Sequence, residues 1–386
     1  MSMLLSLASP AWGEELPRAK WSPVMQEIFS TMAYLLPRSL DEERFSNESE
    51  RAEIAKQITA LANAVAQLEQ SGHEGRDRGS SLVYLSQSLG RDVEQARMRF
   101  DAGLYEEARY FVVGSLHNCF ACHARRPSQN RFPLAEQLTD EVGLDELDPQ
   151  ETAVLYVVTR RFREAIDTWQ AMLRDPKIEP REVDEAGVLT DYLAVAVRGL
   201  QEIAPTRKAL EGFARREGVS PYLRSHLDAW VGALADIEKH PKLLEVKLEQ
   251  VRALIERADK ASDAPRDRHG LVYDLAASSS LHQLIDRGAG TQEALSPRDQ
   301  SEAYFLLGRI EARSMTQFWI DESAHHLEAS VRAMPKGAHA ARALAMFEEN
   351  MISDYGAREV GDLPTDVWVR IQTLRELVHG QPAATN

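Results

Sequence analysis

Apolar residues recur at helical spacing along almost the whole chain. In the clearest segment the successive spacings are four, three, four and three residues, and the positions are Ile54, Ile58, Leu61, Val65 and Leu68. This period places them on one face of a helix and leaves polar residues such as Glu53 and Gln57 outside that face. No segment alternates convincingly in the manner of a β-strand, and clusters of β-branched residues are few. The pattern therefore predicts an all-α protein.

Four helices are predicted in the first third of the chain. They cover residues 22–36, the striped segment as far as residue 71, residues 80–100 and residues 105–125. Ser22 is the expected N-cap of the first helix, Pro23 suits its first position, and Pro37 is expected to end it. The link at residues 101–103 is short. Helices of similar length with short or moderate links are typical of an up-down-up-down four-helix bundle.

From about residue 150 the helical pattern resembles tetratricopeptide helix pairs. One pair joins residues 153–156 to residues 161–166 through a short turn. A later pair has Leu307 and Gly308 in its first helix, Ala324 and Ala329 in its second, and Pro335 as terminator. Large and small residues interlock in such repeats, and a proline closes the second helix. The pattern is degenerate, so a helical domain without true repeats remains an alternative.

Other segments of the second half are easier to classify by composition than by repeat. Residues 222–257 are expected to be helical, whereas residues 260–267 and 287–298 have the composition of loops. His325 and His326 are adjacent on a predicted helix. Their side chains should diverge, so they are a poor metal-binding pair.

The charge and the amino terminus narrow the class of protein. The 386 residues include 45 basic and 60 acidic side chains, giving a net charge of −15, which disfavours nucleic acid as a partner. No apolar stretch reaches the roughly 18 residues that a membrane-spanning helix needs. Residues 1–13 look like the back half of a secretory signal peptide, although the usual basic start is missing. We therefore expect export, with a loose apolar tail as the alternative.

The candidate chemistry is concentrated in one short segment. The only two cysteines of the chain, Cys119 and Cys122, lie three residues apart, and His123 follows directly. Two thiols at this spacing followed by histidine suit covalent attachment of haem, because each sulfur forms a thioether and the imidazole binds the iron. The segment predicts one covalently bound haem c.

Three other interpretations of the cysteine pair are weaker. A structural zinc site usually needs four ligands from two such pairs, and the chain has no second pair. A thioredoxin-type redox pair belongs to a βαβ unit, whereas the surrounding pattern is helical. A disulfide between the two cysteines would not account for the histidine.

A CxxCH motif near the end of the fourth helix of a bundle resembles the class II c-type cytochromes, the cytochrome c-prime group. The resemblance covers residues 21–131 and implies that Cys119, Cys122 and His123 hold the haem. It also implies that a methionine on the first helix binds the iron in low-spin members, whereas an apolar residue there leaves the iron open to small gases. Attachment outside the bacterial cytoplasm is typical of the group, which favours a periplasmic location. A dimer is common among its members, and the long second half is not.

The resemblance also implies a role for basic residues that follow the motif. Arg125 and Arg126 occupy that place, and Arg131 lies close by. Their guanidinium groups are suited to pairing with the haem propionates. A solvated basic face is the alternative.

Bundle geometry limits the candidates for the sixth iron ligand. In an up-down bundle, the starts of the first and third helices share one pole with the ends of the second and fourth. Met25, Met32 and His73 lie toward that pole. The two methionines are seven residues apart, hence on the same side of the first helix and about 10 Å apart along its axis. The resemblance favours Met25, with Met32 and His73 as weaker candidates.

These observations predict an exported monohaem protein with a haem domain at residues 21–131 and a helical, tetratricopeptide-like domain at residues 150–386. The leading hypothesis is one-electron transfer, with the second domain docking a redox partner protein. One alternative is a gas-binding protein or sensor for nitric oxide or carbon monoxide. Another is a helical scaffold in which haem is structural.

Overall fold

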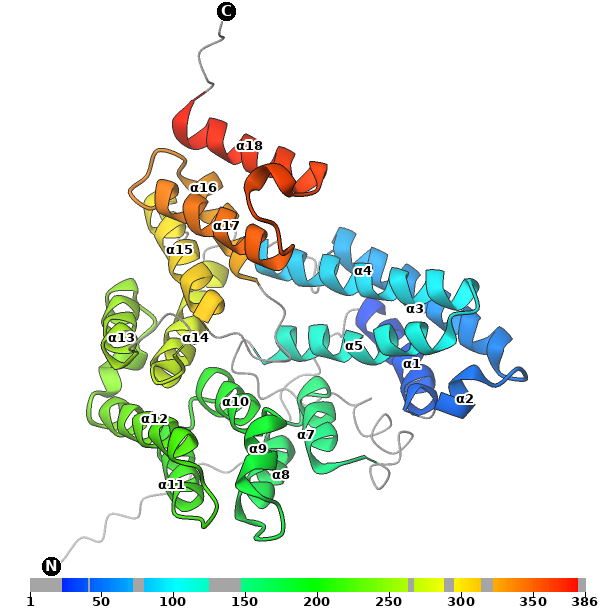
Figure 1. Ribbon diagram of the computed structural model, residues 1–386, viewed down its shortest axis with the longest axis horizontal. Helices are drawn as coiled ribbons and strands as arrows, with labels where there is room; N and C mark the ends of the chain where they lie inside the picture. Colours follow the sequence, from blue (N-terminus) through cyan, green and yellow to red (C-terminus); the bar gives the residue numbers. More distant parts are fainter. Residues whose placement is uncertain are drawn as a thin grey trace, which may run out of the picture.

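The computed structural model describes residues 23–40, 42–71, 80–124, 147–262, 267–287, 295–313 and 322–380 (Figure 1). Within these residues the secondary structure is helical throughout and contains no strand, so the all-α prediction is confirmed for this part of the chain. None of its helices is both long and apolar enough to cross a membrane.

Four helices, which we call the N-terminal helix group, pack around a shared apolar core. They are α1 (Pro23–Ser39), α3 (Arg51–Ser71), α4 (Ser80–Asp101) and α5 (Tyr105–His123). The five apolar stripe positions of α3 are all buried, as their spacing predicts. The short helix α2 (Glu42–Ser46), which was not predicted, buries Phe45 edge-to-face against Phe100 at 5.6 Å between ring centroids.

The first helix continues past the proline that was expected to end it. It begins at Pro23 as predicted, contains Pro37 and ends at Ser39. Ser39 Oγ donates to the carbonyl of Leu35 at 2.8 Å, and Arg38 Nη1 donates to that of Tyr34 at 3.0 Å. These side chains add hydrogen bonds to carbonyls of the last turn, near the end of the helix. The expected N-cap, Ser22, lies outside the described residues.

The turn between α4 and α5 follows from one glycine. Gly103 has a φ of +78°, a left-handed conformation that glycine adopts without strain. Its N–H donates to Phe100, and the N–H of Leu104 donates to Arg99, which together form a Schellman motif. α4 and α5 therefore meet at the predicted link and run back along each other.

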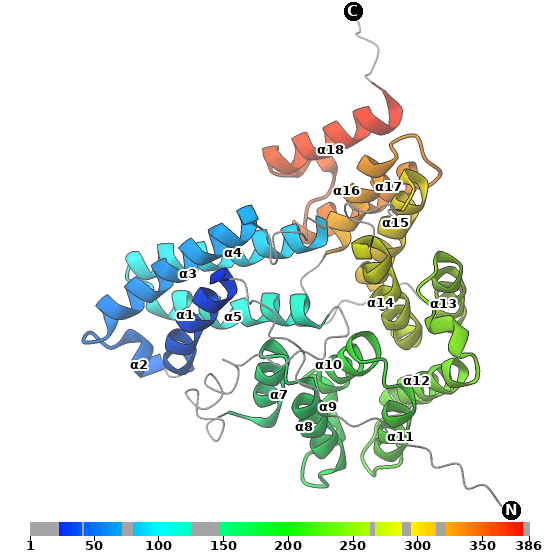
Figure 2. The same ribbon diagram turned by 180° about the vertical axis from the view of Figure 1, so that it is seen from behind.

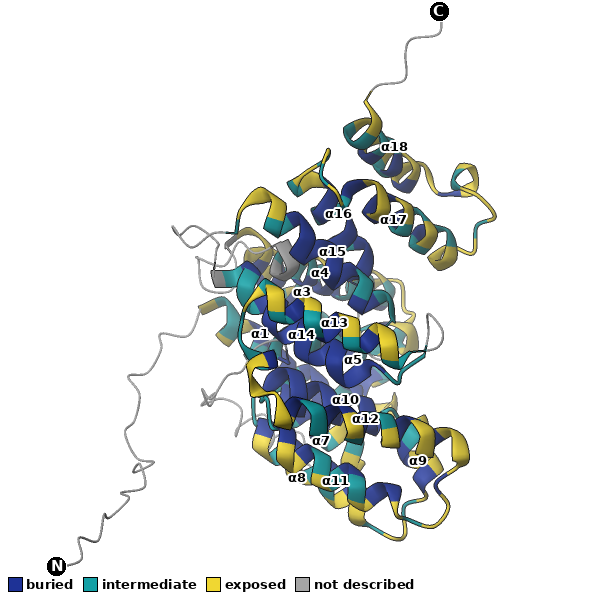
Figure 3. Ribbon diagram, turned by 90° about the vertical axis from the view of Figure 1, so that its left-hand side faces the viewer, coloured by how far each residue is buried: buried dark blue, intermediate teal, exposed yellow. Residues whose placement is uncertain are grey.

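The remaining helices, which we call the C-terminal helices, follow one another around an arc (Figures 1 and 2). They are α7 (Pro149–Val158), α8 (Phe162–Arg174), α9 (Pro180–Glu185), α10 (Val188–Leu193), the π-helical η2 (Ala194–Gly199), α11 (Ile203–Ala214), α12 (Pro221–Lys239), η3 (Pro241–Leu244), α13 (Leu248–Ala261), α14 (Leu271–Arg287), α15 (Pro297–Arg313), α16 (Ser323–Ala333), α17 (Ala340–Asp354), η4 (Val360–Asp362) and α18 (Thr365–His379). Helices adjacent in sequence pack as pairs, and α4 and α5 point into the arc. α10 and α14 are almost entirely buried in the middle of the molecule (Figure 3).

The α15–α16 pair contains the large-small interlock suggested by the sequence. A Cβ atom placed on Gly308 of α15 would lie 2.6 Å from Cγ of Leu327 of α16, so only glycine allows this approach. α16 ends at Ala333, two residues before the expected terminator Pro335.

Three expected boundaries in the second half differ from the structure. The helix predicted over residues 222–257 is interrupted after Lys239, because Pro241 starts the short η3 and α13 begins only at Leu248. α13 then continues to Ala261, inside the segment expected to be a loop. α15 starts at Pro297, where the proline takes a first-turn position that needs no N–H donor.

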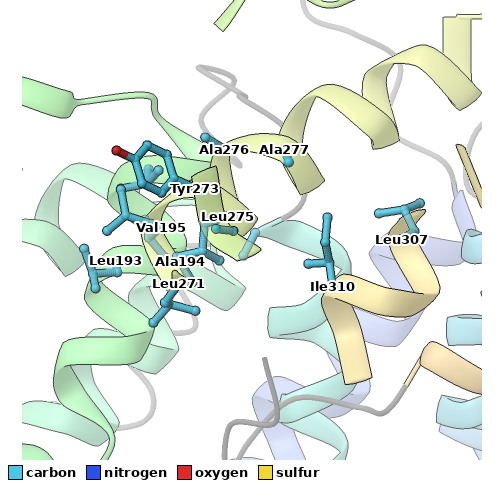
Figure 4. Packing of buried hydrophobic residues seen from close by; sticks show 14 of the residues in the cluster. Leu193, Ala194, Val195, Leu271, Tyr273, Leu275, Ala276, Ala277, Leu307 and Ile310 are labelled. Carbon is cyan, nitrogen blue, oxygen red and sulfur yellow. The ribbon is translucent and has the colours of Figure 1, made fainter. Parts of the chain in front are cut away.

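The two parts of the chain share buried surface. Phe120 and Ala124, at the end of α5, belong to the same core as the C-terminal helices. That core includes η2, whose Ala194 and Val195 lie close to Leu271 and Leu275 of α14 (Figure 4). Tyr84 of α4 stacks on His325 of α16 with ring centroids 4.8 Å apart. The end of α5 is thus held by both parts.

Candidate functional site

A cleft opens at one pole of the N-terminal helix group. Its lining comes from the start of α1, the end of α3, the first half of α4 and the end of α5: Met25, Ile28, Leu68, Leu85, Ser86, Leu89, Asn118, Cys119, Cys122 and His123. The cavity between them is about 40 Å³, far below the roughly 300–1,000 Å³ that small-molecule and cofactor sites occupy, so a group as large as haem fits here only if the surrounding helices move apart. The bundle argument predicted that these helix ends would share a pole, and the cleft lies there.

The CxxCH segment faces this cleft as a unit. Cys119, Cys122 and His123 are helical and stand at positions i, i+3 and i+4, which lie on one face of an α-helix. Each is partly buried. The last turn of α5 therefore presents both thiols and the imidazole to the same space.

The thiols are not joined in a disulfide. Cys119 is partly accessible as a residue, yet burial, together with the neighbouring Cys122, raises the pKa of its thiol to about 12. Redox-active CxxC pairs depend on a lowered thiol pKa. The raised pKa of Cys119 is the opposite of what a thioredoxin-type function needs.

The imidazole of His123 is oriented by the other part of the chain. Its Nδ1 lies 2.6 Å from the carbonyl oxygen of Val158, the last residue of α7. A carbonyl oxygen only accepts, so Nδ1 carries the proton and donates it, which leaves the ring lone pair on Nε2. Histidine ligands of metals are commonly fixed in this way through their second nitrogen.

The candidates for the sixth ligand occupy different environments. Met25 is partly buried and lines the cleft. Met32 is only 5% exposed and packs in the core of the N-terminal helix group, with its Sδ 4.0 Å from Ser115 Oγ. The structure thus brings Met25, but not Met32, to the lining of the cleft beside the CxxCH segment. His73, Arg125, Arg126 and Arg131 lie outside the described residues.

A carboxylate of α4 approaches the wall of the cleft. Asn118 Nδ2 donates to Asp92 Oδ2 at 2.7 Å, and burial raises the pKa of Asp92 above its usual value. Burial also lowers the pKa of the neighbouring His117. Sequence reasoning missed Asp92, because it lies 26 residues before Asn118 on another helix and no motif marks it.

We compared the chain with known protein families, curated proteins and solved structures. No protein-family model, no curated protein and no solved structure matches this chain.

The donor atoms at the cleft, rather than its volume, suit a covalently attached haem. Apolar side chains from α1, α3 and α4 line the cleft beside them. The two thiols stand three residues apart on one face of α5, as in a CxxCH motif, and the tautomer of His123 leaves Nε2 as the nitrogen that could bind a metal. Met25 adds a thioether, a soft ligand suited to iron.

Proposed function

We propose that this chain is an exported monohaem c-type cytochrome that transfers single electrons. In this proposal the N-terminal helix group is a four-helix bundle of the class II type. The observation that carries the proposal is the single cleft at which Met25, Cys119, Cys122 and His123 meet.

Each of these residues has a distinct part. Cys119 and Cys122 would hold the haem through thioethers, His123 would bind the iron through Nε2, and Met25 would bind it through Sδ. Haem held by histidine and methionine cycles between ferrous and ferric states and is typical of electron carriers.

The protein supplies the surroundings that tune this exchange. Ile28, Leu68, Leu85 and Leu89 give the cleft an apolar lining, and an apolar site disfavours extra positive charge. The hydrogen bond from His123 to Val158 orients the imidazole ring. Arg125 and Arg126 are proposed to pair with the haem propionates. The C-terminal helices are proposed to dock a redox partner protein in the periplasm.

The function is tested by comparing two methionine variants with the wild-type protein. We expect the ferric wild type to be low-spin and to show the thioether-to-iron charge-transfer band at the red end of the visible range. Met25→Ala should lose this band, because its sulfur is at the cleft. Met32→Leu, a volume-conserving change in the core, should keep it.

Carbon monoxide provides the second half of this test. A six-coordinate ferrous wild type should bind the gas poorly, whereas ferrous Met25→Ala should bind it readily. A high-spin wild type that binds carbon monoxide at once would refute electron transfer through a methionine-ligated haem. That outcome would support the gas-binding alternative, in which Ile28 and Leu89 provide an apolar pocket.

A further inference from the structure

A second group of chemistry-bearing side chains lies away from the cleft, among the C-terminal helices. It consists of His282 on α14, Glu311 on α15 and Glu322, the residue that precedes α16. They are 3%, 7% and 4% exposed, respectively. One nitrogen or oxygen atom from each lies within 4.8 Å of the corresponding atoms of the other two. Three separate elements therefore direct donor atoms to one buried point.

Two further groups flank this cluster. His326 Nε2 lies 3.4 Å from Glu322 Oε2, and Arg198 Nη1 lies 4.0 Å from Glu311 Oε1. Arg198 comes from η2, a π-helical segment, and such segments occur frequently at functional sites. Both flanking residues are almost fully buried. Residues in such positions contact the carboxylate ligands of a metal and orient them without binding the ion themselves.

The charges favour a bound cation. Glu311 and Glu322 bring two carboxylates into the protein interior, where like charges repel strongly and the loss of hydration is costly. Arg198 lies beside Glu311. A divalent cation held between the two carboxylates reduces their mutual repulsion.

We propose that His282, Glu311 and Glu322 bind one divalent first-row transition metal ion of the Zn²⁺ class. An imidazole beside two carboxylates is a donor set suited to zinc, whereas Mg²⁺ and Ca²⁺ prefer oxygen ligands alone. The ion joins α14, α15 and the start of α16. The three side chains leave at least one coordination position of the ion for a further ligand.

A second histidine-carboxylate cluster provides an internal comparison. His226, Asp267 and His269 also come close together, but the rings of His226 and His269 are stacked 4.4 Å apart at 20°. The lone pairs of nearly parallel rings do not converge on one ion. His269 Nε2 is also within 2.9 Å of Ser225 Oγ. We therefore assign the metal to the buried cluster.

The test uses the full-length, haem-loaded protein, stripped of loosely bound metal with EDTA. Zinc chloride is added, excess ion is removed by gel filtration, and zinc is counted by elemental mass spectrometry. Wild-type protein should retain one zinc per chain and melt at a higher temperature with zinc than without it. Magnesium should give neither effect.

Variants then locate the zinc. His282→Gln and Glu311→Gln should lose the retained ion, and His326→Gln should weaken zinc binding by about 10- to 100-fold. Two matched controls should retain it. Glu302→Gln alters another largely buried glutamate of α15, which pairs with Arg252 instead, and His269→Gln disrupts the comparison cluster.

Two results would overturn the proposal. One is a wild type that retains no zinc and shows no zinc-dependent rise in melting temperature, which would mean a buried ion-pair network only. The other is zinc that persists in Glu311→Gln and disappears in His269→Gln. The measurement on the wild-type protein can refute the proposal by itself, even if one of the variants fails to fold. The outcome is also independent of the haem, since zinc and iron are counted separately.

Discussion

At the residue scale, the orientation of His123 depends on a contact that its motif does not contain. The cysteines and histidine stand within five residues, so their shared helix face follows from sequence alone. The carbonyl of Val158 lies 35 residues further along the chain. Only the folded chain shows that the end of α7 fixes the ring.

Asp274 is a second residue whose behaviour depends on distant neighbours. It is buried on α14, where Arg313 Nη2 donates to its Oδ1 at 2.6 Å. Burial raises the pKa of its carboxyl to about 7, although Arg313 acts to lower it. Arg309 also lowers this pKa, and Asp259 raises it.

We predict that this carboxyl makes the free energy of unfolding depend on pH. The folded protein holds the proton more tightly than the unfolded chain, so its stabilising effect is complete below about pH 4. That contribution is lost as the pH rises to about 7. Asp274→Asn should flatten this part of the profile of unfolding free energy against pH, measured by urea denaturation. Asp228→Asn, on the exposed face of α12, should leave the profile unchanged, and a profile of Asp274→Asn parallel to the wild type would contradict the assignment.

At the element scale, the packing of α15 against α16 depends on the absence of one side chain. Sequence reasoning found Gly308 through the large-small pattern, but it could not identify Leu327 as the partner. The pattern shows that a small residue is needed in a helix pair. The neighbouring helix and its register decide which large residue fills the space.

Two glycine substitutions should have effects of opposite sign. Gly308→Ala should lower the free energy of unfolding by about 1–3 kcal/mol, because its Cβ would lie 2.6 Å from Leu327 Cγ. Gly232→Ala should raise that free energy by about 0.5–1 kcal/mol, because Gly232 is exposed on α12 with nothing within 4 Å of an added Cβ. Thermal unfolding followed by circular dichroism measures both. If both substitutions changed the free energy of unfolding by the same amount and in the same direction, the close contact between Gly308 and Leu327 would be contradicted.

Helix boundaries were the least predictable elements. Pro37 was expected to end the first helix, yet the helix continues two residues beyond it to Ser39, where side chains of Arg38 and Ser39 bond carbonyls of the last turn. Pro241 interrupts a segment expected to be continuous. The effect of a proline depends on whether neighbouring groups can satisfy the backbone that it disturbs.

At the scale of the whole molecule, α5 connects the two parts of the protein. Cys119 faces the cleft, whereas the next residue, Phe120, is buried in the core of the C-terminal helices. Tyr84 makes a second connection through its stack on His325. A change in the C-terminal helices should therefore affect the cleft beside Cys119, and a change at the cleft should affect those helices.

This arrangement predicts that the protein unfolds as one unit. Urea unfolding followed by haem absorbance and by far-ultraviolet circular dichroism should give the same midpoint. Phe120→Ala should lower both midpoints together, with a loss of about 3–5 kcal/mol in the free energy of unfolding. An early loss of the haem signal, with the remaining helices still folded, would show that the two parts are independent.

The parts of the site that could be predicted are those that depend on spacing within a helix or on the poles of a bundle. Bundle geometry placed Met25 and Met32 toward the same pole, the resemblance favoured Met25, and of these two methionines the structure places only Met25 at the cleft. The supporting Asp92 and the buried cluster of His282, Glu311 and Glu322 were not predicted. Their residues are far apart in the sequence, and only the packing of several helices brings them together.

The most direct test of the account is whether haem remains on the chain after denaturation. The protein should be produced in a host that attaches haem c to exported proteins, then denatured in acid and extracted with organic solvent. Wild-type chain should keep its haem absorbance and have an intact mass greater than the polypeptide by one haem, whereas the Cys119→Ser, Cys122→Ser double variant should have neither. A wild type whose haem is extracted, or which acquires none, would contradict the assignment of Cys119, Cys122 and His123 as a haem-binding site.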